Sequence, residues 1–208
     1  MKKKKTRQEK SSIYNEALSG SRKLRIRRTC QLADHCISNI AAYKAYWRKD
    51  ARSKSELIVN RDFWKRANGN FLDIAVLEWC KVFSERSGEH HWSKIFKSKQ
   101  DWLENFCQHM NMSKKEFCAD LQRVVKYRNK YVAHLEPIPM KYPSTDFLLK
   151  SVSYLYDQIR SSPSTNDAVS DYGFTASELF REKLKKATAE VLFAEKYKDK
   201  FFDCLHAL

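Results

Sequence analysis

An arginine, an asparagine and a histidine lie close together in the segment YRNKYVAHLEP, residues 127–137. Arg128 carries a planar guanidinium that grips phosphate through two parallel hydrogen bonds, and His134 has a side chain that exchanges protons near neutral pH. Asn129 follows the arginine directly and can both donate and accept hydrogen bonds. Together these residue types suit acid–base chemistry on a phosphate group.

The position of Arg128 in its helix is unusual. A helix beginning at Ser113 places Leu121, Arg128 and Leu135 seven residues apart, so Arg128 falls in the middle of the apolar stripe, within about 20° of both leucines. A guanidinium is costly to bury there unless it meets a carboxylate, a phosphate or a wet cleft. One explanation is a structural ion pair, with Glu78 or Asp73 as the partner.

His134 lies six residues beyond Arg128, about 120° around and about 9 Å along an ideal helix. One helix therefore cannot easily aim both groups at one point, although Pro137 disfavours helix at Glu136 and can turn His134 further. A second copy of the helix, antiparallel across a twofold axis, would bring each Arg128 near the other protomer's histidine. The geometry predicts a composite site; the structural alternative is that His134 only closes the helix C-terminus.

These residues carry a resemblance to a known family. Arg128-Asn129, four residues and then His134, late in a helix of an all-α chain, resembles the R-x4–6-H signature of the HEPN superfamily. The polar residue after the arginine matches as well, and RNKYVAHL is similar to the version found in HEPN proteins linked to abortive infection. The motif covers seven residues, and the compatible helical layout covers most of residues 22–200.

The resemblance implies a chemistry. Active HEPN proteins are metal-independent endoribonucleases of toxin or abortive-infection type that dimerise and pool two motifs in one cleft. By that likeness, His134 exchanges protons with the 2′-hydroxyl and the leaving 5′-oxygen, and Arg128 stabilises the scissile phosphate. Asn129 orients the histidine or contacts RNA, and the products are 2′,3′-cyclic phosphate and 5′-hydroxyl ends.

Further residues near the motif are candidates for RNA contacts, because single strands are held by base stacking and phosphate pairing. They are Tyr127, Lys130, Tyr131, Lys141 and Tyr142. HEPN domains without catalysis also exist, so the alternative function is a non-catalytic module that binds RNA or protein.

Composition predicts the fold. Four glycines and four prolines in 208 residues favour long helices, and no strand pattern is evident. We predict one all-α domain, a bundle of five to six helices spanning residues 21–208, after a basic, disordered tail over residues 1–20. The expected helices cover residues 22–47, 61–83, 99–110, 113–135 and 145–160, with a last one from residue 175.

The net charge of +15 is concentrated at the N-terminus. Residues 1–28 hold eleven Lys or Arg against two Glu, whereas the other 180 residues hold 29 against 23 Asp or Glu. Such a tail either touches phosphates or keeps the protein soluble. The run RKLRIRR at residues 22–28 allows a DNA-binding interpretation as well, although only sequence-blind and salt-dependent binding would follow.

Other classes of site find little support. The six cysteines show no C-x-x-C spacing, which indicates reduced thiols used as small core residues. The pair His90-His91 lacks further ligands for a metal, and the isolated glycines form no nucleotide-binding loop. We expect no cofactor, no metal and no membrane contact. The expectation is a cytoplasmic homodimer that acts on RNA and is restrained by an antitoxin or regulatory protein.

Overall fold

The computed structural model describes residues 7–47, 62–133 and 142–206, with side chains over residues 21–47, 66–133 and 142–194. These residues form an all-helical fold, as predicted. The α-helices are α1 (Arg7–Tyr46), α2 (Asp62–Phe83), α3 (Lys99–Met110), α4 (Lys114–Tyr127), α5 (Thr145–Ser161) and α6 (Ala176–His206). Three short turns of other helix types are η1 (Trp92–Lys94), η2 (Arg128–Val132) and η3 (Asn166–Ala168). No helix in the described part of the chain is both long and apolar enough to cross a membrane.

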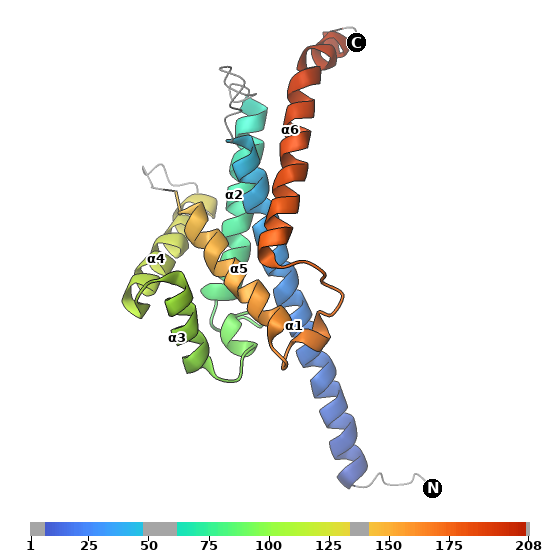
Figure 1. The fold of residues 1–208 in the computed structure, drawn as a ribbon, viewed down its shortest axis with the longest axis vertical. Helices are drawn as coiled ribbons and strands as arrows, with labels where there is room; N and C mark the ends of the chain where they lie inside the picture. Colours follow the sequence, from blue (N-terminus) through green and yellow to red (C-terminus); the bar gives the residue numbers. More distant parts are fainter. Residues whose placement is uncertain (1–6, 48–61, 134–141, 207–208) are drawn as a thin grey trace.

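Helix α1 is the axis of the molecule. It contacts α2, α5 and α6, and Figure 1 shows its N-terminal end projecting beyond the other helices. Helix α6 follows the other half of α1 and continues to the C-terminus at the opposite end of the molecule (Figure 1). Helices α3 and α4 form a hairpin that packs on α5, and α4 also contacts α2. The segment that carries Arg128, η2, follows the end of this hairpin and also contacts α2.

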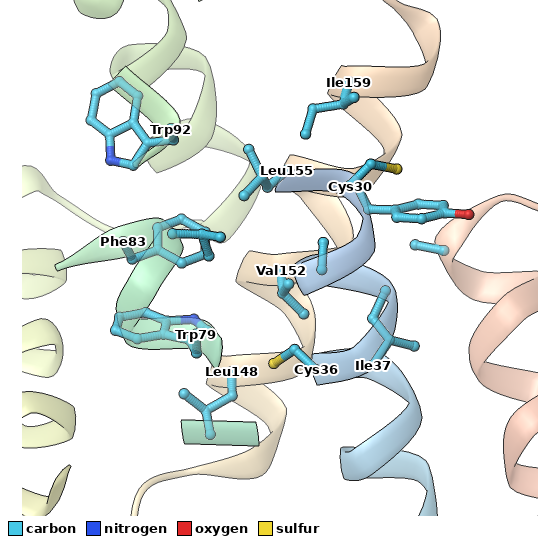
Figure 2. Close-up of a cluster of buried hydrophobic side chains, with 14 of the residues drawn as sticks. Cys30, Cys36, Ile37, Trp79, Phe83, Trp92, Leu148, Val152, Leu155 and Ile159 are labelled. Carbon is cyan, nitrogen blue, oxygen red and sulfur yellow. The ribbon is translucent and has the colours of Figure 1, made fainter. Parts of the chain in front are cut away.

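The hydrophobic core lies where α1, α2 and α5 meet. Figure 2 shows Cys36 and Ile37 of α1 beside Val152 of α5, with Trp79 of α2 on the other side. These four side chains are fully buried. The Trp79 indole donates a hydrogen bond to the Ser151 hydroxyl at 2.8 Å, which satisfies the one polar atom of the ring inside the core.

The start of α1 differs from the expectation. We predicted a disordered tail as far as residue 20, whereas the structure has helix from Arg7 onward. The helix continues through the glycine at position 20, because a single glycine costs a helix only about 1 kcal/mol relative to alanine. Residues 1–6, with the four-lysine run, lie outside the described residues.

Two helix starts, predicted at residues 113 and 175, each carry a capping box in the structure. The Ser113 hydroxyl accepts the backbone N–H of Glu116 at 3.2 Å, and the Glu116 carboxylate accepts the N–H of Ser113 at 2.7 Å. Thr175 and Glu178 make the same reciprocal pair at the start of α6. Each pair satisfies two backbone donors that the first helical turn leaves unpaired, so the pattern can be read from four residues.

Four cysteines serve as small core residues, as predicted. Cys30, Cys36, Cys80 and Cys107 are buried, and burial raises the pKa of Cys30 to about 12 and that of Cys80 to about 11. These thiols stay protonated at neutral pH and are poor nucleophiles. Cys118 differs from them because it is exposed on α4.

Candidate functional site

The apolar stripe of α4 is rotated relative to the prediction. Its buried members are Phe117, Val124 and Tyr127, whereas the Arg128 side chain keeps 25% of its surface exposed. Arg128 therefore lies at the edge of the stripe, and our placement of it in the centre was wrong. The prediction failed because Tyr127 was taken as an RNA contact, whereas its ring belongs to the core.

The helix also changes type at the arginine. From Arg128 to Val132 the backbone forms a π-helical turn, η2, in which the Ala133 N–H donates to the Arg128 carbonyl at 3.0 Å, five residues back. The wider turn ends the regular 100° steps on which the predicted position of His134 depended. Single π turns are rare and recur at functional sites, so η2 is a second unusual feature at the same residue.

Two acceptors hold the guanidinium of Arg128. Its Nη1 donates to Oε1 of Glu85 at 2.8 Å, and its Nε donates to Oδ1 of Asn129 at 2.9 Å. Glu85 lies just beyond the C-terminal end of α2, and its side chain is 41% exposed. The guanidinium therefore sits at a partly open surface with a carboxylate on one side and an amide on the other.

The predicted partners of Arg128 make other contacts. The Glu78 carboxylate lies 3.4 Å from Nδ1 of His35, and that of Asp73 accepts a hydrogen bond from the Tyr127 hydroxyl at 2.8 Å. The ion pair that was considered as an alternative is present, but its partner is Glu85. Sequence reasoning missed Glu85 because it follows the last turn of α2, where side-chain direction depends on how the chain turns.

Tyr127 belongs to the core of this region. It is 2% exposed, and burial followed by the bond to Asp73 raises its pKa. Burial also raises the pKa of Asp73, although the hydrogen bond from Tyr127 opposes this shift. In this conformation the Tyr127 ring is closed to a nucleobase, so its predicted stacking role does not fit its position.

A group of aromatic rings surrounds Tyr127. The Tyr131 ring stacks on it with centroids 5.3 Å apart, and the Tyr142 ring lies 5.9 Å from Tyr127 and 6.3 Å from Tyr131. Tyr142 is 61% exposed, and Tyr131 is partly exposed. The structure therefore gathers these two predicted RNA-contact residues, although they lie eleven positions apart in the chain.

The structure describes some of the remaining predicted site residues and leaves others outside the described ranges. Asn129 is exposed and Lys130 is partly exposed, both on η2 beside Arg128. His134 and Lys141 lie outside the described residues. The described part of the site is therefore Arg128, Asn129, Lys130, Tyr131 and Tyr142, and the structure adds Glu85 and Asp73 to it.

His91, half of the histidine pair, has a structural role. Its Nε2 lies 3.1 Å from the Phe83 carbonyl, and its Nδ1 accepts the Ser93 N–H at 3.2 Å. A carbonyl only accepts, so Nε2 carries the proton; because Nδ1 accepts the Ser93 N–H, it carries none and the ring is neutral. Burial lowers the pKa of His91, which favours the same state. Both ring nitrogens are thus used to hold the turn between α2 and η1.

The basic run at residues 22–28 is partly used by the fold. Nη1 of Arg27 donates to the Asp171 carboxylate at 3.0 Å, and Nη1 of Arg22 donates to the Ser164 carbonyl at 3.0 Å. Both contacts reach the segment between α5 and α6. These two arginines therefore anchor a connection as well as contributing positive charge, which weakens the DNA-binding interpretation of this run.

The arrangement can hold an anion. Positive charge at the end of the α3–α4 hairpin comes from Arg128 and Lys130, and the exposed ring of Tyr142 offers a stacking surface. The ion pair with Glu85 holds the Arg128 guanidinium in place. In comparisons with known proteins, no protein-family model, no curated protein and no solved structure matches this chain.

Proposed function

We propose that this protein is a metal-independent endoribonuclease of toxin or abortive-infection type, with an HEPN-like fold. The observation that carries the proposal is the placement of Arg128. Its guanidinium stands partly exposed on a π turn, held by Glu85 and Asn129, and the motif histidine follows six residues later. An arginine placed for stability alone has no need of this partly open, two-sided arrangement.

Arg128 would hold the scissile phosphate. A guanidinium carries five N–H donors, and the two bonds to Glu85 and Asn129 use two of them. A phosphate can therefore bind without breaking both contacts, and it meets a cation that is already oriented. Charge that develops on the phosphate oxygens would be stabilised by the same group.

His134 would supply the proton transfers. The resemblance assigns it the role of general acid and base, with cleavage to 2′,3′-cyclic phosphate and 5′-hydroxyl ends. Tyr131 and Tyr142 would stack on bases, and Lys130 and Lys141 would contact the RNA backbone. Tyr127 would act indirectly, by supporting the ring of Tyr131.

The assembled form would be a cytoplasmic homodimer. Each composite site would combine Arg128 of one protomer with His134 of the partner subunit. A ribonuclease of this type needs restraint in its own cell, so we also propose an antitoxin or regulatory protein as a partner.

The test is cleavage of total RNA with EDTA present, using wild type, Arg128→Ala and His134→Ala. We expect cleavage by wild type, at least a hundredfold loss in both variants, and cyclic phosphate ends on the products. Arg123→Ala is the matched control, because Arg123 lies on the same helix, is 76% exposed and pairs with Asp120. Loss of activity in Arg123→Ala as well, or full activity in Arg128→Ala and His134→Ala, would contradict the assignment.

A non-catalytic HEPN module is the second candidate. The observation in its favour is the Arg128–Glu85 pair itself, which satisfies the arginine without any phosphate. In that case wild type would bind RNA or a protein but leave RNA intact. Binding that survives His134→Ala, with no cleavage by wild type, would favour this candidate.

A further inference from the structure

A pocket lies next to the Arg128 site, between the end of α2, η1, α3 and α4. Its volume is about 190 Å³, and its walls include the rings of Phe83, Trp92 and Phe117 and the side chain of Leu121. Figure 2 shows Trp92 and Phe83 on the same side of the core. Apolar cavities of about 150 Å³ are known to accept a benzene ring, so this pocket has room for a planar ring system.

The mouth of the pocket is positively charged. Arg86 and Lys114 belong to its lining, although Lys114 also lies 3.4 Å from the Glu104 carboxylate. An apolar interior with cations at its entrance suits a flat ring attached to an anion.

The pocket and Arg128 lie on the same side of α4. Leu121 and Arg128 are seven residues apart, which is two turns and about 10 Å along the helix axis. The turn after α2 links them as well, because Ser84 and Arg86 line the pocket while Glu85 between them binds Arg128. A separation of about 10 Å along the axis is within the reach of a neighbouring nucleotide if a strand has its phosphate at Arg128.

We propose that this pocket receives one nucleobase of a bound RNA strand, next to the phosphate held by Arg128. The aromatic walls contact the base, and Arg86 and Lys114 hold the backbone phosphate of that nucleotide. Gln122 and Ser84 lie at the lining and can bind the edge of the base; the Ser84 hydroxyl donates to the Cys80 carbonyl at 2.9 Å and so offers an acceptor. This inference rests on the proposed function and adds a site that selects the base beside the cut.

The experiment uses binding, so that it does not depend on cleavage. The probes are six-nucleotide 2′-O-methyl RNAs, which cannot be cleaved because they lack the free 2′-hydroxyl that acts as nucleophile. In a series of these RNAs, one nucleotide at a time is replaced by an abasic residue. Affinity is measured by fluorescence anisotropy on the full chain. We expect one abasic position to lose about tenfold or more in affinity, and its neighbours to lose less than threefold.

A variant that fills the pocket makes the assignment specific. Cys118 is exposed and lines the pocket, so Cys118→Phe places a ring there without disturbing the core. Ala119→Phe makes a similar addition at the next residue, which is exposed and does not line the pocket. For Cys118→Phe we expect the intact RNA to bind about tenfold more weakly, and we expect no abasic position to weaken binding further than its neighbours do. For Ala119→Phe we expect the same affinities as for wild type.

The outcomes separate this inference from the proposed function. Equal losses at every abasic position, or equal behaviour of Cys118→Phe and Ala119→Phe, would overturn the base pocket even if wild type cleaves RNA. One sensitive position that only Cys118→Phe removes would support the pocket even if no RNA is cleaved. Circular dichroism and thermal unfolding of both variants show whether they are folded.

Discussion

The ion pair between Arg128 and Glu85 has consequences at the scale of single residues. The Glu85 carboxylate orients the guanidinium, but its negative charge also opposes the binding of a phosphate to the remaining donors. Because Glu85 is 41% exposed, solvent screens the pair, and exposed pairs contribute only about 0.2–1 kcal/mol. The contact therefore holds Arg128 in place while contributing little to stability, and the negative charge of Glu85 opposes the proposed RNA ligand.

Glu85→Gln tests this balance. The amide keeps an acceptor for Arg128 but removes the competing charge, so we expect the affinity for a non-cleavable RNA to rise by up to about fivefold. Glu89→Gln in the same loop makes the same change in net charge on another exposed side chain. Equal gains in both variants would show that only net charge matters, and a loss in Glu85→Gln would show that its charge is needed to orient the arginine.

The bond between Tyr127 and Asp73 gives a prediction about stability. Tyr127→Phe removes the hydroxyl that Asp73 accepts, so the free energy of unfolding should fall by about 1–3 kcal/mol. Asp73→Asn keeps an acceptor without the charge that burial disfavours, so it should leave stability at pH 7 unchanged or slightly higher. Urea unfolding of both variants measures the two effects, and equal destabilisation would contradict this account.

At the scale of elements, η1 and the turn before it depend on a neutral histidine. Nδ1 of His91 accepts a hydrogen bond from the Ser93 N–H. Protonation of Nδ1 would remove this acceptor and place two N–H groups face to face. Burial is the main cause that lowers the pKa of His91 in the folded state. In the unfolded chain the histidine has its ordinary pKa of about 6.5, so as the pH falls the unfolded state binds a proton at this residue before the folded state does.

The resulting prediction is a loss of stability between about pH 7 and pH 5, because the unfolded state binds more protons over that range. His91→Gln should show a shallower decline, since glutamine does not titrate. Unfolding free energies at several pH values, with the histidine ring signals followed by NMR, make the test. A decline that is identical in wild type and His91→Gln would exclude His91 as its source.

The elements also show how far sequence patterns reach. The two capping boxes located the starts of α4 and α6, and helical periodicity located α2, α3 and α5 to within about one or two residues. The π turn η2 gave no such signal. It coincides with two long-range contacts, that of Tyr127 with Asp73 and that of Arg128 with Glu85.

At the scale of the whole molecule, the composite site makes a prediction about mixed dimers. Arg128→Ala and His134→Ala are each expected to be inactive under the proposed function, but a heterodimer of the two would contain one intact site, with Arg128 from one protomer and His134 of the partner subunit. An equal mixture with free subunit exchange holds about half heterodimers and should recover about a quarter of wild-type activity.

RNA cleavage by the mixed or co-expressed variants checks this prediction, with sedimentation analysis of the wild type alongside. No recovery in a mixture that does form heterodimers would place both residues of one site on the same protomer. A wild-type protein that cleaves RNA as a monomer would rule out the composite arrangement.

The amino-acid sequence by itself determined the features that depend on local patterns. Few glycines and prolines, helical periodicity and capping residues sufficed for an all-α fold with most helices in place, because these signals act within a few turns of the chain. The sequence also singled out Arg128, Asn129 and Tyr131 through their types and spacing.

Only the tertiary structure decided which partner each of these residues meets. Glu85 rather than Glu78 binds Arg128, Tyr127 is a buried ring instead of an RNA contact, and Tyr142 joins Tyr131. The pocket beside the site likewise combines side chains from α2, α3 and α4. Such contacts depend on how helices far apart in the chain rotate and pack against one another, and no local pattern of residues encodes that rotation.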